Sequence, residues 1–369
     1  MLRVALVTEF YHPHLGGVTE HVHNLALQFR EWGHEVIVLT ANMRGQGHDA
    51  PFVRRIGTSL VIYANGAFAR VTAGWGLRQQ VEAILREERI DLVHLHGSLA
   101  PTLGLVAAAA AHRLDLPVVA TFHSWFPRSV TYRAFRRPLQ RRLDRHAATI
   151  AVSAPVVDAL SRYFTADWEI IPNGVDTGYF QPNGRKVTDA FVRGPRLLFL
   201  GRLDPRNGLD TAIDAMPSIL ERLPGSRLVV AGDGPLRNHY INKARHLGDR
   251  VEFLGRVRDE RPHIYGTADL YLCPTTKASF GITLLEAMAC GTPLVVSDII
   301  GFRELVNGGE EAKLVPMNDA SAWASTVVDL IEDPGRRALM ATAGRAKSAS
   351  FSWPTVAARV AEVYRRVLT

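Results

Sequence analysis

The first half of the chain alternates short apolar runs with segments whose apolar residues recur at helical spacing. Val18, Val22, Leu25 and Phe29 recur every three or four residues, which predicts an amphipathic helix, and a second helix is expected over 77–89. The intervening runs are typical of buried strands, which we expect at residues 4–7, 35–40, 92–96, 118–122 and 149–153. Strands that alternate with helices predict a parallel sheet covered by helices on both faces.

The alternation stops at a polar stretch, residues 181–194, and then restarts. This stretch predicts a linker between two domains, 1–180 and 195–352, and a chain of 369 residues is long enough for two cores. A last helical segment, 353–369, follows them. The predicted fold class is α/β, with two Rossmann-like parallel-sheet domains facing across a cleft; ligands in such folds gather at the carboxyl ends of the strands. Further strands are expected at 196–200, 227–231, 251–254, 270–274 and 294–297, and further helices at 209–223 and 235–247.

The stretch from Phe280 to Gly291 carries the clearest chemical signal. It lies between two apolar runs and is typical of a short polar loop followed by a helix, which Gly291 and Pro293 end. Such a loop points free backbone N–H groups and a helix N-terminus at the space above the sheet, which suits an anion. Glu286 lies one turn into the helix, where it can accept hydrogen bonds from hydroxyls. A diphosphate attached to a polyhydroxylated ligand fits this arrangement, and ordinary strand–helix–strand packing is the alternative.

Composition narrows the class of protein only partly. The net charge of +7 and the pI of about 9.6 fit an anionic membrane, a nucleic acid or a phosphorylated substrate, and do not choose among them. Cys273 and Cys290 stand in apolar contexts, which argues against a disulfide framework and fits a reducing cytosol. We expect no signal peptide, because Met1–Thr8 reads as a buried strand, and the alanine-rich run Gly104–Ala111 is too short to span a bilayer.

Two groups of candidate residues follow predicted strands of the first half. Gly16 and Gly17 open the first helix, where a phosphate can approach the backbone closely, although a simple turn explains them equally well. This is not the G-x-G-x-x-G fingerprint, which counts against a nicotinamide enzyme. His123 ends a strand, where it can bind a sugar hydroxyl or be satisfied within the core. His94 and His96 also lie at a strand end and are expected to alternate across the strand, so that at most one of them faces the cleft.

Three further groups follow predicted strands of the second half. Arg202 and Arg206 lie in the run Gly201–Gly208 and offer fixed positive charge to a leaving diphosphate, with solvated surface arginines as the alternative. The turns Gly232–Pro235 and Gly255–Val257 are weaker signals. The second of these turns, which contains Arg256 and Val257, could present its backbone to a nucleobase.

A basic run, residues 128–145, contains seven arginines and only one acidic residue, Asp144. Aromatic residues accompany it, so the run is typical of an amphipathic helix that binds an anionic membrane surface. A solvated helix face is the alternative, and nucleic acid is not expected because no nucleic-acid fold signature accompanies the run. Membrane or acceptor contacts are expected from Arg128, Arg133, Arg136 and Arg137.

Taken together, the chain resembles the family 4 retaining glycosyltransferases of the GT-B fold, and within them the phosphatidylinositol mannosyltransferases and related lipid-directed enzymes. The resemblance covers essentially the whole chain and rests on motifs in the expected order. These are Pro13-His-Leu-Gly-Gly-Val18, Ala120-Thr-Phe-His123, Pro172-Asn-Gly-Val-Asp176, Gly201-Arg202, Gly232-Asp-Gly-Pro235, and Ser279-Phe-Gly281 through Glu286-Ala-Met288.

The resemblance implies a GDP- or UDP-linked hexose donor, mannose or glucose, held mostly by the second domain. It implies that Gly16 and Gly17 contact the diphosphate, that His123 touches the transferred sugar and takes part in catalysis, and that Arg202 neutralises the leaving phosphate. Glu286 would hold the ribose hydroxyls. Residues 280–283, namely Phe280, Gly281, Ile282 and Thr283, would bind the donor beside it.

The resemblance also implies no divalent metal and no cofactor, and the sequence shows no ligand cluster with metal spacing. It implies that residues 353–369 cross back onto the first domain. The acceptor would be a lipid or a carbohydrate, and we expect a cytoplasmic enzyme, peripheral on the inner face of the cell membrane.

Two positions depart from the family pattern. Ala278 stands where the family has the first glutamate of its Glu-x7-Glu motif, and Asn207 stands where it has a lysine. Arg206 could supply the missing charge, and Ser279, Thr275, Thr276 or Lys277 could contact the sugar. The alternative function is therefore a nucleotide-sugar-binding protein with an altered donor site and weakened catalysis.

Overall fold

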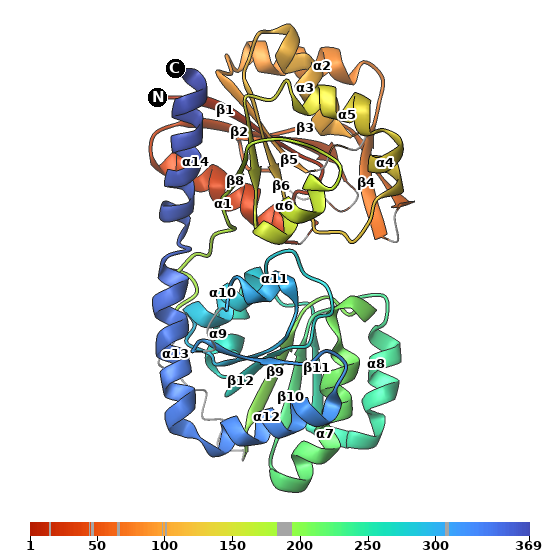
Figure 1. Cartoon of the computed structure of the whole chain (residues 1–369), viewed down its shortest axis with the longest axis vertical. Helices are drawn as coiled ribbons and strands as arrows, with labels where there is room; N and C mark the ends of the chain where they lie inside the picture. The colour runs from red at the N-terminus through yellow and green to blue at the C-terminus, as the bar shows by residue number, and fades with distance from the viewer. Residues whose placement is uncertain are drawn as a thin grey trace. The chain divides into compact units, whose positions relative to one another are not determined.

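The computed structural model describes residues 1–14, 16–43, 45, 48–64, 67–97, 99, 102–182, 194–306 and 310–369. These residues form two compact units (Figure 1), one of residues 1–174 and 353–369 and the other of residues 175–352. The first unit ends before the boundary expected at residue 180, because the backbone N–H of Val175 donates to the carbonyl of Phe351 in the second unit (2.8 Å). The expected linker, 181–194, lies mostly outside the described residues.

The sheet of the first unit has eight strands in the order β4-β3-β2-β1-β5-β6-β7-β8. Its neighbouring strands are parallel except β3 and β4, which pair antiparallel at one edge. The apolar pattern did not predict this hairpin, because an edge pair with one solvated face has no continuous apolar run. The strands are β1 (Arg3–Thr8), β2 (Glu35–Asn42), β3 (Val53–Ala64), β4 (Ala67–Ala73), β5 (Leu92–Gly97), β6 (Val118–Phe122), β7 (Ala148–Ala151) and β8 (Trp168–Ile170).

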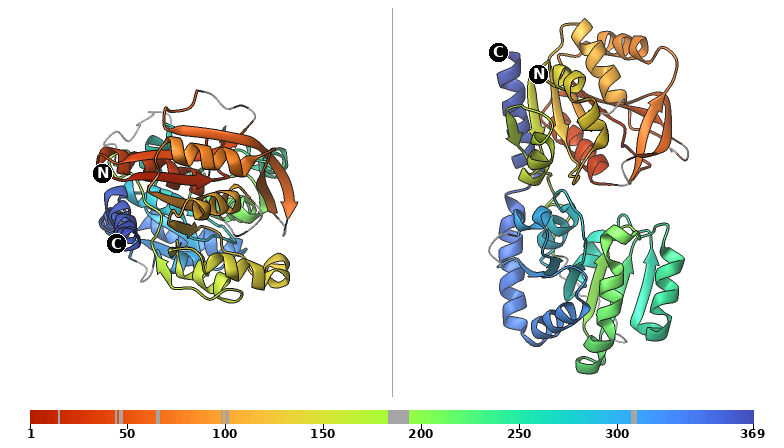
Figure 2. Two further views of the ribbon diagram at one scale, coloured as in Figure 1. Left: turned by 90° about the horizontal axis from the view of Figure 1, so that it is seen from above. Right: turned by 45° about the vertical axis from the view of Figure 1, so that its right-hand side comes forward.

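Helices cover both faces of this sheet (Figures 1 and 2). One face packs against α1 and α14, where the Tyr364 ring stacks on Phe29 with 5.3 Å between centroids. The other face packs against α2, α3 and α6. The last helix therefore belongs to the first unit although it follows the second in sequence. The helices are α1 (Gly17–Glu31), α2 (Leu77–Glu87), α3 (Leu103–Arg113), α4 (Val130–Ala134), α5 (Arg136–Leu143), α6 (Ala154–Ser161) and α14 (Trp353–Leu368).

The sheet of the second unit has six parallel strands in the order β11-β10-β9-β12-β13-β14. Alternate residues of β9 enter different cores: Leu197 and Phe199 pack with α7 and α12, and Leu198 packs with α10. The strands are β9 (Arg196–Leu200), β10 (Arg227–Ala231), β11 (Val251–Gly255), β12 (Leu270–Cys273), β13 (Leu294–Ser297) and β14 (Ala312–Val315). The helices are α7 (Leu209–Arg222), α8 (Arg237–Ala244), α9 (Arg261–Gly266), α10 (Ile282–Ala289), α11 (Ile300–Arg303), α12 (Ala320–Glu332) and α13 (Pro334–Ala349), with 3₁₀ turns η1 (Pro205–Asn207) and η2 (Arg245–Arg250).

The basic run is not the single amphipathic helix that its composition predicted. It forms two short helices, α4 and α5, which are interrupted at Phe135. Cys273 and Cys290 are both free and buried, as expected. Among the described residues, no helix has both the length and the apolar character needed to cross a bilayer.

Candidate functional site

The start of α10 is built as the sequence predicted. Gly281 precedes the helix with φ of 113°, a conformation that favours glycine, and a Cβ there would meet Phe302 at 3.0 Å. Its other end is a Schellman motif, in which Gly291 has φ of 72° and Thr292 N–H donates to the Ala287 carbonyl (2.9 Å). The helix therefore begins and ends at fixed points, and its first amides remain available to an anion.

Glu286 lies inside this helix with its side chain only 4% exposed. Arg261 donates from Nη1 to Glu286 Oε1 (2.7 Å), and the Tyr265 hydroxyl donates to Oε2 (3.0 Å). The Arg261 guanidinium also lies over the Phe180 ring, 5.2 Å from its centroid. The ion pair and the hydroxyl bond together fix both carboxylate oxygens of Glu286 in place.

The loop after β9 carries the two predicted arginines. Arg202 and Arg206 are each about half exposed, at 54% and 56%, and both approach Asp204, at 3.8 and 3.3 Å. The Asn207 side chain is used within the loop, where Nδ2 donates to the Arg202 carbonyl (2.7 Å). Thr276 N–H donates to the Arg206 carbonyl (2.8 Å), which joins this loop to the one that leads to Phe280.

Glycines let the loops at this sheet edge pack backbone against backbone. A Cβ on Gly208 would lie 2.0 Å from the Pro274 carbonyl oxygen, and one on Gly232 would lie 1.9 Å from that of Gly201. Gly232 N–H in turn donates to the Gly255 carbonyl (2.7 Å), and Gly255 directly precedes the exposed Arg256 and half-buried Val257. Close packing thus gives the Gly232–Pro235 turn a structural role and gathers the loops after β9, β10, β11 and β12 at one edge.

In the first unit, Gly16 and Gly17 are both exposed at the start of α1. Gly16 has φ of 164°, which any residue adopts, and a Cβ there would make only ordinary contact with His14 (3.5 Å). Neither backbone strain nor crowding within the protein therefore requires glycine at this position. A helix N-terminus without a side chain beside it leaves space that an anion can approach.

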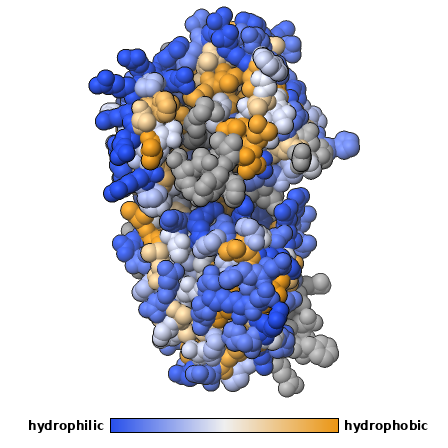
Figure 3. All heavy atoms as spheres, turned by 90° about the vertical axis from the view of Figure 1, so that its right-hand side faces the viewer, coloured by the Kyte–Doolittle hydropathy of each residue, from blue (hydrophilic) through white to orange (hydrophobic). Residues whose placement is uncertain are grey.

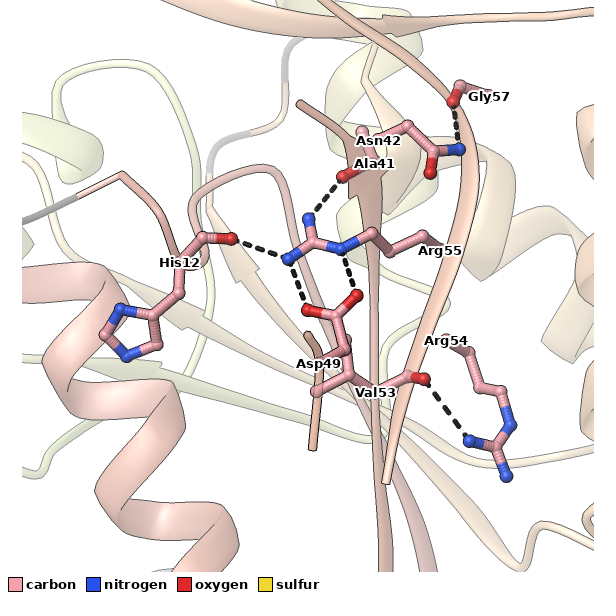
Figure 4. A network of polar contacts seen from close by, with 8 residues as sticks. All are labelled: His12, Ala41, Asn42, Asp49, Val53, Arg54, Arg55 and Gly57. Carbon is pink, nitrogen blue, oxygen red and sulfur yellow. Dashed lines mark hydrogen bonds and ion pairs between the residues drawn. The ribbon is translucent and has the colours of Figure 1, made fainter. Parts of the chain in front are cut away.

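A buried arginine anchors the loop that leads to these glycines (Figure 4). Arg55 donates from Nη2 to the His12 carbonyl (2.6 Å) and from Nη1 to the Ala41 carbonyl (2.8 Å). It also forms a two-point ion pair with Asp49, at 2.7 and 2.8 Å. The Arg55 side chain is 6% exposed, and it holds the pKa of Asp49 below its usual value. The anchor joins the loop after β1 to β2 and β3.

His123 lies directly after β6 within a cluster of buried imidazoles. Its Nε2 lies 3.2 Å from Nδ1 of His96 on β5, and its ring centroid lies 4.9 Å from that of His21 on α1. Asn173 accepts a hydrogen bond from His21 Nδ1 through Oδ1 (2.9 Å). Burial lowers the pKa of His21 to about 4 and lowers the pKa of His96 and His123 well below the usual value. All three rings are therefore neutral near pH 7.

The expectation that His94 and His96 point to opposite sides is wrong. Residues two apart on a strand share a face, and their ring centroids lie 4.1 Å apart. His94 is saturated, because its Nδ1 bonds to the Tyr364 hydroxyl (2.6 Å) and its Nε2 to the Thr121 hydroxyl (2.7 Å). His94 therefore packs against the cluster through His96 and offers no free ring nitrogen to it.

Comparison with known proteins agrees with this architecture. A family model described as glycosyltransferase family 4 matches residues 15–179, and one described as glycosyl transferases group 1 matches residues 194–333. The chain is 33% identical to phosphatidyl-myo-inositol mannosyltransferase of Mycolicibacterium smegmatis, over 99% of this chain and 94% of that protein. It is also 33% identical to the Mycobacterium tuberculosis protein of the same name, over 99% and 97%.

The chain belongs to glycosyltransferase family 4. Its fold is also that of solved GT-B glycosyltransferases. Anabaena Alr3699/HepE in complex with UDP superposes with a TM-score of 0.79 at 21% identity, over 99% of this chain and 100% of that one. Sucrose-phosphate synthase from Thermosynechococcus elongatus superposes with a TM-score of 0.77 at 21% identity, over 100% and 99%.

Within this glycosyltransferase, the sequence motifs pointed to the loops but missed the residues that support them. Arg261 and Tyr265, the partners of Glu286, lie on α9 and carry no motif of their own. Asn173 lies in the Pro172–Asp176 motif and His21 in the helix that follows the Pro13–Val18 motif, but neither was assigned a role. His21 lies on the buried face of α1, four residues after Gly17, and this position could have indicated a role for it.

Proposed function

We propose that this glycosyltransferase transfers a hexose, mannose or glucose, from a GDP- or UDP-linked donor to an acceptor hydroxyl, with retention of anomeric configuration. The observation that carries the proposal is Glu286, a buried carboxylate fixed by Arg261 and Tyr265 one turn behind the open start of α10. A carboxylate that accepts hydrogen bonds from hydroxyls, placed beside backbone amides that bind an anion, suits the ribose and the diphosphate of a nucleotide sugar.

The proposed chemistry depends on charge and position. Arg202, about half exposed at the same sheet edge, neutralises the departing diphosphate, and the nearby Arg206 provides the charge that Asn207 lacks. Amides of residues 280–283 bind the donor, and the backbone at Arg256 and Val257 faces its base. In the first unit, Gly16 and Gly17 leave room for phosphate, and His123 binds the transferred sugar. The transfer uses no divalent metal and no cofactor.

The names of the relatives support mannose as the sugar and phosphatidylinositol as the acceptor. A donor panel tests the first part: we expect one nucleotide sugar to raise the melting temperature, since a hundredfold excess over its dissociation constant adds about 2.7 kcal/mol of stability. Transfer to phosphatidylinositol vesicles, in EDTA, tests the rest. Product of inverted configuration would refute retention, and binding without transfer to any acceptor would favour the alternative of a binding protein.

We further propose peripheral attachment to an anionic membrane through α4 and α5. Arg128, Arg133 and Arg137 are exposed there beside Val130, 68% exposed, and Phe135, 58% exposed. On the side of the molecule that carries α4 and β4, hydrophobic side chains lie among hydrophilic ones (Figure 3). Basic and apolar groups together suit an anionic lipid surface.

Vesicle co-sedimentation tests this attachment. The double variant Arg133→Glu and Arg137→Glu should bind anionic vesicles less well than the parent chain, whereas Arg250→Glu in the second unit should not. Arg136 is left unchanged because its Nε also supports the fold by donating to the Tyr163 carbonyl (2.8 Å). Binding should fall with added salt. Equal binding to neutral vesicles would contradict the proposal.

A further inference from the structure

Three imidazoles from separate elements converge inside the first unit. His21 on α1, His96 on β5 and His123 after β6 are 1%, 2% and 9% exposed. One nitrogen from each lies within 4.8 Å of the others. The Trp353 ring, itself 5% exposed, packs against His21 with 5.3 Å between centroids.

The hydrogen bonds leave ligand atoms open. Asn173 Oδ1 accepts only, so His21 carries its proton on Nδ1 and presents a lone pair at Nε2. That Nε2 is buried and has no hydrogen-bond partner among the described residues. Buried polar atoms without partners are uncommon and call for an explanation. Histidines that bind a metal through one ring nitrogen usually donate a hydrogen bond from the other, as His21 does from Nδ1 to the Asn173 side chain.

The spacing of one nitrogen pair suits a metal ion as well as a hydrogen bond, and His21 would complete the set by a small shift of its ring. His96 Nδ1 and His123 Nε2 are 3.2 Å apart, close to the nitrogen–nitrogen edge of roughly 3.3 Å in a tetrahedron with Zn–N bonds of about 2.0–2.1 Å. His94 supplies no ligand, because both its nitrogens are bonded to hydroxyls.

We propose that His21, His96 and His123 form a binding site for one transition-metal ion of the kind that prefers imidazole, such as Zn²⁺ or Co²⁺. Three nitrogen ligands leave a fourth position open to water or to another oxygen donor. The proposed transfer chemistry itself uses no metal, but it shares His123 with this site. Since His123 is shared, metal binding withdraws its imidazole from the sugar, and added Zn²⁺ inhibits transfer reversibly.

Titration of the metal-free full chain with Co²⁺, without donor or acceptor, tests the site independently of any transferase activity. We expect one ion per chain, with the visible absorption of a tetrahedral complex, displaced by Zn²⁺. His21→Gln and His96→Gln should weaken binding by about tenfold or more, and Asn173→Ala by about 10–100-fold, as for other supporting partners of metal ligands. His23→Gln is the matched control, because His23 lies on the same helix and bonds instead to the Tyr11 hydroxyl (2.9 Å).

Two outcomes would overturn the proposal. One is a parent chain that takes up no stoichiometric Co²⁺. The other is binding that His21→Gln and His96→Gln leave intact while His23→Gln removes it. Circular dichroism checks that each variant folds. X-ray absorption of the Zn²⁺-loaded parent chain needs no variant at all: it should count three imidazole ligands, and a shell of oxygen ligands only would refute the site.

Discussion

Lowering the pH from 7 to 5 should destabilise the first unit selectively. Burial lowers the pKa of His21 from 6.5 in the unfolded chain to about 4 in the fold. The unfolded chain therefore binds this proton first as the pH falls. The stability linked to His21 is fully present above pH 6.5, is lost between 6.5 and about 4, and changes no further below that. Between pH 7 and pH 5, protonation linked to His21 alone lowers the free energy of unfolding by about 2 kcal/mol.

Other buried histidines of the first unit act in the same direction. Burial lowers the pKa of His94, His96 and His123 well below the usual value and that of His146 to about 4. The total loss should therefore exceed the share of His21. The second unit provides an internal control, since its histidines, His239, His246 and His263, are all exposed.

Hydrogen exchange followed by mass spectrometry measures both units in the same intact chain. In EDTA, and after correction for the intrinsic exchange rate, amides of β1, β5 and β6 should lose opening free energy between pH 7 and 5, while those of β9 and β10 should not. In His21→Gln, the loss of opening free energy in the first unit between pH 7 and pH 5 should be smaller by about 2 kcal/mol. Equal losses in both units, or no loss in β5 and β6, would refute the assignment of neutral buried imidazoles.

Three further predictions concern the loops. Arg202→Ala should raise the activation free energy of transfer by about 3 kcal/mol, as the removal of one oxyanion-hole donor does in other enzymes, with little change in melting temperature. Unchanged sugar transfer would refute its role. Arg261→Met should destabilise the second unit by about 3 kcal/mol because it leaves a buried carboxylate unpaired, and the double variant with Glu286→Gln should recover part of that loss in thermal unfolding. Arg55→Met frees the loop before Gly16, so steady-state kinetics should show a higher donor KM with kcat less affected.

The fold was largely predictable because parallel strands buried on both faces are short apolar runs. The strands expected at 4–7, 118–122 and 196–200 appear as β1, β6 and β9. The strands that were not predicted are β3, β4, β8 and β14, of which the last two have only three and four residues. The β3–β4 hairpin has exposed apolar residues, Leu60 at 47% and Val61 at 55%, and so gives no clear apolar or alternating pattern.

The parts of the candidate site that depend on local backbone conformation could be predicted from the sequence. The parts that depend on tertiary contacts could not. Gly281 and Gly291 reveal their positive φ values through residue type alone. The partners of Glu286 are 25 and 21 residues away on another helix, and no local pattern relates them. The histidine cluster likewise depends on a helix and two strands that only the folded sheet brings together.

The two departures from the family pattern act on different parts of the site. The carbonyl oxygen of Ala278 would lie 2.1 Å from a Cβ on Gly301, so the backbone of this loop packs tightly against that glycine. A glutamate side chain at position 278 is therefore not needed to shape it. Asn207 is likewise used to brace the Arg202 carbonyl. The backbone proposed to bind phosphate and Glu286 thus remain intact, while the carboxylate that the family places at position 278 is absent. We therefore expect affinity for a nucleotide diphosphate to persist and selectivity for the sugar to change.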